Sequence, residues 1–377
     1  MMERRKNLND KFGFVDSMKI KDFIDYEQPN EYIVESDRYN SKYSTPVLTA
    51  GQSFILGYTN ESKGVYEKGP CIIFDDFTTS VHYVDFPFKV KSSAMKILTT
   101  KSNANIKYCY YLLLSLSKMP PNHKRQWIST TSEKSYVLPS MDKQISIVKQ
   151  LDLISDTIAN YTNQNENLDN LVKARFIEMF GDPVADTKNW GQTLLKEHLE
   201  SIKYGTSTPP IFTDDGYAFI RATNIKNGKI VANDMKYIPQ EEADRLEKCK
   251  LSGGEIIIVR SGVNAGDTCV VTDEYIGQYA GYDMILVLSS DLHPVFFNTL
   301  INTEYMDKVV KPLTRRAAQP HLNSEQTQRL PIIEVPFELQ KQFADFVQQV
   351  DKSREEVKRS LEKTQQLYDS LMQEYFG

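Results

Sequence analysis

The 377-residue sequence predicts an α+β protein with pseudo-two-fold symmetry: two mixed α/β domains separated by two long antiparallel coiled-coil helices. The first observation behind this prediction is an internal repeat. Residues 178–181 read Glu-Met-Phe-Gly, and residues 374–377, 196 positions later, read Glu-Tyr-Phe-Gly. At the same offset and without a gap, Gln144 falls on Gln340. An internal repeat defines the architecture of a chain, so each half is expected to end in a copy of one long helix.

The second observation is a heptad pattern in both copies, which span residues 139–181 and 331–377. Apolar residues recur in alternating steps of three and four, the pattern of a helix that buries one narrow stripe against another helix. The two stripes consist of Ile147, Leu151, Ile154, Ile158, Tyr161, Leu168, Val172 and Met179, and of Phe343, Val347, Val350, Val357, Leu361, Tyr368, Leu371 and Tyr375. Polar residues interrupt them at Asn165, Arg175, Arg354 and Thr364.

The ends of the two helices carry ordinary start and stop residues. Pro139 and Pro336 precede the helices, where a missing N–H costs little, and Gly181 and Gly377 stand at their ends. Neither apolar stripe is stable in water alone, so the two helices are predicted to pack against each other with a globular unit at each end. Each could run about 55–60 Å. The alternative is that they are ordinary structural helices with no further role.

Residues 1–138 and 182–330 have a different texture from the helices. Short runs rich in Val, Ile, Tyr and Phe alternate with Gly, Asn, Asp and Ser, which is typical of strands and turns. Residues 71–74 (Cys-Ile-Ile-Phe) and 256–259 (Ile-Ile-Ile-Val) are predicted to be equivalent buried strands, one in each segment. The beginnings of the two segments are also weakly similar in sequence, since residues 20–24 resemble residues 195–199. Helices that stay alike while the segments between them diverge suggest that the segments recognise different things.

The bulk composition is that of an ordinary soluble protein, with 40% hydrophobic and 25% charged residues. The net charge is −5, so any nucleic-acid surface must be local. The charged N-terminus is followed by no apolar stretch, which predicts a cytoplasmic protein without a signal peptide or a membrane span. The four cysteines form no Cys-x-x-Cys pair and are expected to be free thiols in a reducing compartment.

A basic cluster lies near the end of each variable segment, within residues 123–127 and 308–321. Cationic side chains bind phosphates, arginine reads guanine edges and glutamine reads adenine. A single charge run is usually a solvated face, but two clusters at corresponding places favour contact with DNA. With polar residues of nearby loops, the candidate DNA-contacting set is Thr78, Thr79, Lys124, Arg125, Gln126, Lys203, Arg221, Arg260, Ser261, Asn264, Arg315, Arg316, Gln319 and His321.

No motif predicts a catalytic or metal-binding residue. Pro120-Pro121-Asn122 has the wrong order for an amino-methyltransferase, and residues 262–266 lack the Lys-Ser/Thr of a P-loop. The five histidines form no His-Glu-x-x-His motif. Asp182, Asp186 and Lys188 superficially match a nuclease acid-acid-Lys set. The better explanation is that these three residues form the loop leaving a helix C-terminus.

Several of these stretches resemble, in order and over essentially the whole chain, the specificity subunit of a type I restriction-modification system. Residues 175–183 with Asn189-Trp190 resemble the junction between a central helix and a second recognition domain. Residues 138–144 and 336–340 resemble the entries to two spacer helices, and residues 319–331 resemble the end of a recognition domain.

The resemblance implies target-recognition domains at residues 1–138 and 182–330 and conserved spacer helices at residues 139–181 and 331–377. Each domain would read one half of a split double-stranded DNA site, and the helices would set the number of unread base pairs. The chain itself would hold no cofactor. Methyltransferase subunits would supply S-adenosylmethionine chemistry, and restriction subunits would use ATP and Mg. The first domain lacks a counterpart of Trp190 at its entry, so its start is left open.

Two other classes of protein remain as alternatives. One is a coiled-coil adaptor that joins two protein-binding modules without DNA, and the other is a self-contained restriction-methylation enzyme. Loss of DNA binding with rising salt would exclude the adaptor. Transfer of labelled methyl groups by the chain alone would require the enzyme.

Overall fold

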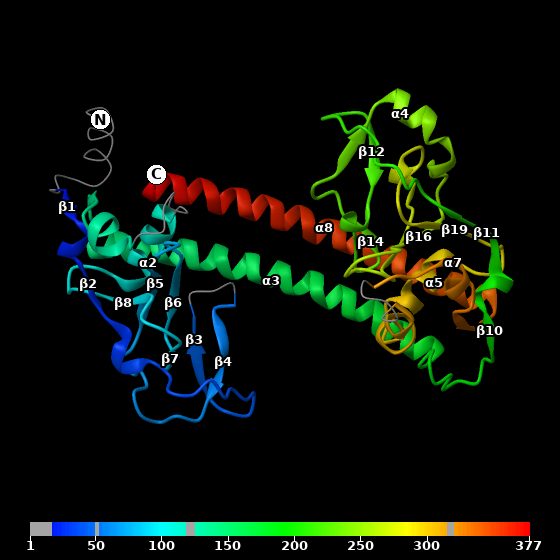
Figure 1. The fold of residues 1–377 in the computed structure, drawn as a ribbon. Coiled ribbons are helices and arrows are strands. Elements are labelled where there is room, and N and C mark those ends of the chain that lie inside the picture. Colours follow the sequence, from blue (N-terminus) through cyan, green and yellow to red (C-terminus); the bar gives the residue numbers. More distant parts are fainter. Residues whose placement is uncertain (1–16, 50–52, 118–124, 315–319) are drawn as a thin grey trace. The chain divides into compact units, whose positions relative to one another are not determined.

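The computed structural model describes residues 17–49, 53–117, 125–314 and 320–377. The chain divides into two compact units, which we call unit 1 (Met1–Tyr161 with Ser360–Gly377) and unit 2 (Thr162–Arg359). Each unit contains part of both long helices, α3 (Met141–Phe180) and α8 (Phe337–Phe376), which have 40 residues each (Figure 1).

The described part of unit 1 contains a four-stranded, a three-stranded and a two-stranded sheet, and one short α-helix that precedes α3 in the sequence. Its elements are β1 (Met18–Lys19), β2 (Ile24–Glu27), β3 (Thr45–Leu48), β4 (Ile55–Thr59), β5 (Cys71–Asp75), β6 (Val81–Val84), β7 (Lys89–Val90), β8 (Met95–Thr100), α2 (Ile106–Leu116) and β9 (Ser135–Tyr136). The larger sheet has the order β2-β8-β5-β6 and is antiparallel throughout. The smaller sheet has the order β4-β3-β7, in which β3 and β7 are parallel.

Unit 2 repeats this plan with additional elements. Its strands are β10 (Gln192–Leu194), β11 (Leu199–Tyr204), β12 (Tyr217–Ile220), β13 (Ile225–Lys226), β14 (Lys229–Ile230), β15 (Lys236–Ile238), β16 (Ile256–Ile258), β17 (Thr268–Val270), β18 (Tyr279–Ala280), β19 (Met284–Leu288) and β20 (Pro331–Ile333). Its short helices are α4 (Gln240–Arg245), α5 (Pro294–Ile301), α6 (Lys311–Thr314) and α7 (Ser324–Gln328).

The strand orders of the two units correspond element by element. The larger sheet of unit 2 is β11-β19-β16-β17 and the smaller one is β15-β12-β18, again with a parallel pair. The predicted equivalence of residues 71–74 and 256–259 is confirmed, because β5 and β16 each lie between the corresponding neighbours. The two-stranded sheets β1-β9 and β10-β20 correspond as well, and short 3-10 turns follow β1 and β10.

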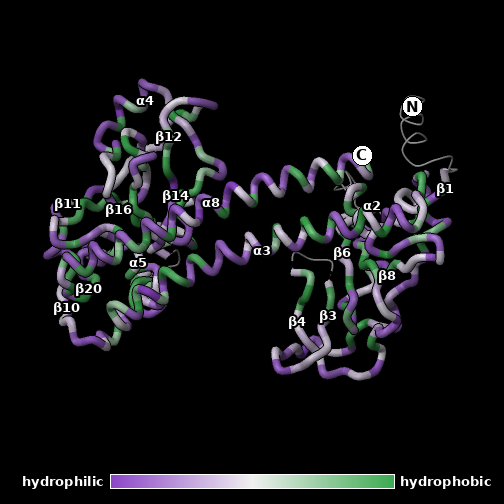
Figure 2. Tube along the Cα trace, turned by 180° about the vertical axis from the view of Figure 1, so that it is seen from behind, coloured by the Kyte–Doolittle hydropathy of each residue, from purple (hydrophilic) through white to green (hydrophobic). Residues whose placement is uncertain are grey.

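The heptad seam is confirmed by the burial of its apolar residues. Every predicted seam residue is buried or half-buried, and Ile147, Leu151 and Phe343 are almost completely inaccessible. Figure 2 shows hydrophobic and hydrophilic stretches alternating along α3 and α8. None of the helices in the described residues is apolar enough over a sufficient length to cross a membrane.

Contacts between α3 and α8 define the relative direction of the two helices. In unit 1, Tyr375 Oη donates to Gln150 Oε1 at 2.7 Å. In unit 2, Arg354 donates to the Asn165 carbonyl at 3.4 Å and pairs with Asp169 at 2.8 Å. Also in unit 2, the rings of Phe176 and Phe343 have centroids 5.5 Å apart. Within this unit the residue numbers fall on α8 as they rise on α3, so the two helices are antiparallel, as predicted. Asn165 and Arg354, two of the polar interruptions of the seam, meet each other.

The helix ends are those that the sequence predicts. Gly181 has a φ of +79°, and its amide donates to the Ile177 carbonyl at 2.8 Å. The Gly377 amide makes the same type of bond with the Gln373 carbonyl at 3.0 Å. A residue with positive φ at this place is the usual way to end a helix.

The repeated glutamine is a buried connection between a long helix and a short one. In unit 1, Gln144 Oε1 accepts a bond from the Asn105 amide at 2.7 Å, and Asn105 is the N-cap of α2. Gln144 Nε2 donates to the carbonyls of Asn103 (3.1 Å) and Pro139 (2.8 Å). One side chain therefore satisfies three backbone groups.

Gln340 makes the same three bonds in unit 2. Its Oε1 accepts from the amide of His293, the N-cap of α5, at 2.8 Å. Its Nε2 donates to the carbonyls of Asp291 (3.1 Å) and Val335 (2.7 Å). The glutamine common to the two repeats thus positions equivalent short helices on equivalent long ones.

Candidate nucleic-acid interface

In both units, the loop after the central strand lies against the segment that carries the predicted basic cluster. The Gln126 amide donates to the Asp76 carbonyl at 2.8 Å, just after β5. The Leu322 amide donates to the Arg260 carbonyl at 2.8 Å, just after β16. Residues 126 and 322 are separated by the same 196 positions as the helical repeat. Both acceptors lie just after the equivalent strands β5 and β16, so the two bonds join corresponding segments of the two units.

In unit 1 this junction is held by a buried ion pair. Asp76 Oδ1 accepts bonds from the amides of Gln126 (3.0 Å) and Trp127 (2.8 Å). Asp76 Oδ2 lies 3.2 Å from Lys96 Nζ, and the two side chains are 1% and 0% exposed. Lys96 also donates to Gln28 Oε1 at 3.0 Å. Because both charges are desolvated, each depends on the other, and together they hold the Gln126–Trp127 backbone in place.

The predicted contact residues of unit 1 separate into exposed and buried side chains. Arg125 is exposed, and its Nε lies 4.0 Å from Asp76 Oδ2. Gln126 and Thr79 are buried, with 9% and 7% of their surface accessible. Thr78 is half-buried and donates to Asp75 Oδ2 at 2.5 Å. Against expectation, Gln126 and Thr79 are not presented as side chains on a surface, because this part of the chain packs onto the end of β5. Lys124 lies outside the described residues.

In unit 2 an arginine, Arg260, follows the equivalent strand β16 and lies over an aromatic ring. The Arg260 guanidinium carbon lies 4.9 Å from the centroid of the Tyr204 ring. The Arg260 amide donates to Asp283 Oδ1 at 3.0 Å. Burial raises the pKa of Asp283 to about 6, and the amide and charge of Arg260 oppose this shift. Arg260 is half-buried and forms no ion pair among the described residues, so its charge is not neutralised by a salt bridge.

Ser261 and His321 contact each other at the same surface, next to Arg260. Ser261 Oγ and His321 Nδ1 are 2.9 Å apart, which joins the loop after β16 to the end of the basic cluster. Tyr204 Oη accepts from the Ser324 amide at 2.8 Å, which fixes the ring under Arg260. The structure therefore brings Arg260, Ser261 and His321 together.

The remaining predicted residues of unit 2 have other surroundings. Arg221 is ion-paired with Asp234 at 3.1 Å and also donates to the Asp234 carbonyl, so its charge is neutralised at the end of β12. Lys203 and Asn264 are half-buried, on β11 and in the loop after β16. Arg315, Arg316 and Gln319 lie outside the described residues.

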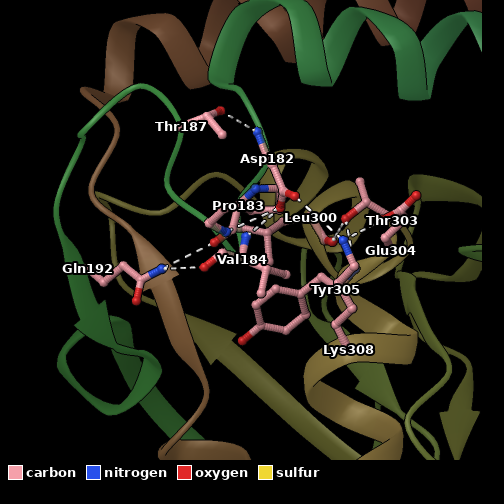
Figure 3. A network of polar contacts seen from close by, with 11 residues as sticks. Asp182, Pro183, Val184, Thr187, Gln192, Leu300, Thr303, Glu304, Tyr305 and Lys308 are labelled. Atoms are coloured by element: carbon pink, nitrogen blue, oxygen red, sulfur yellow. Dashed lines mark hydrogen bonds and ion pairs between the residues drawn. The ribbon is translucent and has the colours of Figure 1, made fainter.

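Two lysines of the second basic cluster contact acidic residues. Lys308 lies 3.6 Å from Asp182 and 2.6 Å from Glu304 (Figure 3). Lys311 pairs with Asp307 at 2.6 Å. These pairs neutralise much of the positive charge that the sequence places here.

The loop after α3 explains the superficial match to a nuclease. Asp182 accepts from the Val184 amide at 2.8 Å, which lowers its pKa (Figure 3). Asp186 accepts from the amides of Trp190 (2.9 Å) and Gly191 (3.0 Å). Lys188 Nζ donates to the helix carbonyls of Glu178 (2.5 Å) and Met179 (3.1 Å). All three side chains terminate the helix and shape its exit, as the sequence predicts.

Sequence reasoning missed the residues that support the candidate surface. Tyr204 belongs to the polar segment that also contains Lys203, but its role as a platform for Arg260 needs the pairing of β11 with β19. Asp76 and Asp283 are charged residues next to apolar strands, and Lys96 is a charged residue within one, β8. A charged residue beside or within a buried strand is the one signal that could have identified them.

The chain is similar to known proteins in part of its sequence and in its fold. Residues 189–365 match the family described as the type I restriction modification DNA specificity domain. The chain is 44% identical over 161 residues to the EcoR124I/EcoR124II specificity subunit of Escherichia coli, an alignment that covers 39% of this chain and 40% of that protein. It is 21% identical over 387 residues to the MjaVIII specificity subunit of Methanocaldococcus jannaschii, covering 93% and 91% of the two chains.

A solved structure with the same fold is the S subunit of a type I restriction-modification system from M. genitalium. The TM-score is 0.62 at 14% identity, and the match covers 97% of this chain and 96% of that one. The matched domain and the two relatives make the chain similar in sequence to specificity subunits of type I restriction-modification systems, and the M. genitalium S subunit shares its fold.

Proposed function

We propose that the chain is the DNA sequence-specificity subunit of a type I restriction-modification complex. One recognition domain reads each half of a bipartite DNA site, and the chain carries the methyltransferase and restriction subunits. The observation behind this proposal is the duplicated junction, Gln126 on Asp76 and Leu322 on Arg260. A surface built twice in one chain suits a target with two parts.

The chemistry of the exposed Arg125 and the half-buried Arg260 supports DNA as the ligand. Arg125 and Arg260 are cations next to loops of polar residues, and arginine can bind phosphate or make a bidentate contact with guanine O6 and N7. The ring of Tyr204 holds the guanidinium of Arg260 before a ligand arrives. Less side-chain entropy is then lost on binding.

Catalysis is proposed to reside entirely in the partner subunits. S-adenosylmethionine would bind to the methyltransferase subunits, and ATP and Mg to the restriction subunits. The names of the two curated relatives, both specificity subunits of restriction enzymes, support this division of labour.

The test is methylome sequencing of cells that carry this chain and a type I methyltransferase subunit. In a second strain, residues 1–138 are replaced by the corresponding segment of another specificity subunit. We expect a split motif in which only one half changes on replacement. If no split motif appears, or if both halves change together, the two-reader proposal is wrong and a coiled-coil adaptor becomes the better explanation.

Replacing Arg260 with alanine is expected to weaken specific DNA binding by about 1–3 kcal/mol if the guanidinium contacts a base pair. Loss of a phosphate contact alone would instead weaken binding to all sequences and reduce the salt dependence by about one charge. Titration of the assembled complex with specific and non-specific duplexes at several salt concentrations separates the two cases. Arg359→Ala, on an exposed part of α8, is the matched control. If the Arg260 and Arg359 variants bind DNA equally well, Arg260 does not contact DNA.

A further inference from the structure

Val263 lies at the tip of the loop after β16 and is 95% exposed. The loop backbone around it is held by hydrogen bonds on both sides. The Gly262 amide donates to the Pro320 carbonyl (3.1 Å), and the Ala265 amide donates to the Gly262 carbonyl (3.0 Å). The Gly266 amide returns to the Val259 carbonyl at 2.8 Å. The loop therefore displays Val263 in a defined position.

The burial of a nearby residue shows that one side of this loop packs against the protein. Ala265, two residues later, is only 5% exposed. Ser261, two residues earlier, is tied to His321. A single exposed apolar side chain is common on protein surfaces. Here, however, the loop turns a small apolar residue inward and the larger one outward, between groups that belong to the candidate DNA surface.

We propose that Val263 contacts the 5-methyl group of a thymine in the half-site read by unit 2. This inference rests on the proposed function and adds a specificity-determining residue to it. Valine has no hydrogen-bond donor or acceptor in its side chain, so it cannot recognise a phosphate or a polar base edge. The thymine methyl is the apolar group that a base presents in the major groove. A β-branched side chain with few rotamers on a held loop loses little entropy in such a contact.

The experiment measures duplex binding by the full chain assembled with a type I methyltransferase subunit. Each thymine of the second half-site is replaced in turn by deoxyuridine, which removes only the methyl group. We expect one position at which this change weakens wild-type binding about fourfold, the equivalent of one buried methyl-sized group. The Val263→Ala variant should bind the thymine and deoxyuridine duplexes equally well at that position.

The control is Ile276→Ala, which removes another exposed aliphatic side chain of unit 2 and should leave the thymine preference intact. The inference is overturned if wild type binds its split site but no thymine position is coupled to Val263, or if the half-site has only G·C pairs. It is also overturned if Val263→Ala weakens the methyltransferase contact alone. Absence of specific binding by the wild-type assembly would instead refute the proposed function itself.

Discussion

Replacing Lys96 with methionine is expected to destabilise unit 1 by about 3–5 kcal/mol, because it leaves the buried carboxylate of Asp76 without its partner. The Lys96 and Asp76 side chains are 0% and 1% exposed. The substitution should also loosen the basic segment at residues 123–127, because Asp76 accepts hydrogen bonds from the amides of Gln126 and Trp127. Under the proposed function, we expect the half-site assigned to unit 1 to lose definition while the other half-site is retained.

Trp127 offers a local probe for this measurement. It is buried in unit 1, and the only other tryptophan of the chain is Trp190. Guanidinium unfolding followed by Trp127 fluorescence, with Trp190→Phe in every protein compared, should report the loss of stability in unit 1. The double variant Lys96→Met/Asp76→Asn keeps an oxygen acceptor without the charge, and it should regain part of the lost stability.

Lys68→Met is the matched control for the buried pair. Lys68 pairs with Glu27 at 2.7 Å in the same unit, but its side chain is 59% exposed. Solvent screens such surface pairs, so this change should have a much smaller effect. Similar unfolding midpoints for the Lys96 and Lys68 variants would show that burial does not make the Lys96–Asp76 pair important.

Replacing Gln340 with leucine is expected to destabilise unit 2 by roughly 3–5 kcal/mol, because three buried backbone groups lose their partner. These are the amide of His293 and the carbonyls of Asp291 and Val335. The effect should be local. Hydrogen exchange of amides in α5 should accelerate more than exchange in unit 1, since Gln340 positions the first turn of that helix.

Gln349→Leu provides the comparison on the same helix. Gln349 is exposed, and surface substitutions of this kind usually change stability by less than about 0.5 kcal/mol. Gln144→Leu should reproduce the Gln340 effect in unit 1, because its three bonds are equivalent. If Gln340→Leu behaves like Gln349→Leu, the repeated glutamine is not the connection that the geometry indicates.

The sequence by itself predicts the regular parts of this protein well. The heptad pattern of residues 139–181 predicts α3, which spans Met141–Phe180. The apolar runs at residues 71–74 and 256–259 predict β5 and β16. Such features repeat along the chain with the period of the structure they form, so a single sequence reveals them. Residues 331–333 are an exception within the second spacer segment, since they form β20 and pair with β10.

The candidate site is less predictable, because exposure depends on partners that are distant in the sequence. Gln126 and Arg125 are neighbours in one basic run, yet the first is buried over Asp76 and the second is exposed. Lys308 has the composition of a phosphate-binding residue but pairs with Asp182, across 126 positions of sequence. Residue type indicates what a side chain can bind, whereas burial and ion pairing determine whether it is free to do so.

The sequence alone determined the duplicated architecture and the antiparallel helices, because periodicity and repetition are properties of the chain itself. Only the tertiary structure decided which charged side chains are buried or paired and which are not. Arg260 depends on the Tyr204 ring of a strand two places away in the sheet, and the unit 1 junction depends on a lysine of β8. These contacts arise from strand pairing and desolvation, which bring together residues that no local pattern connects.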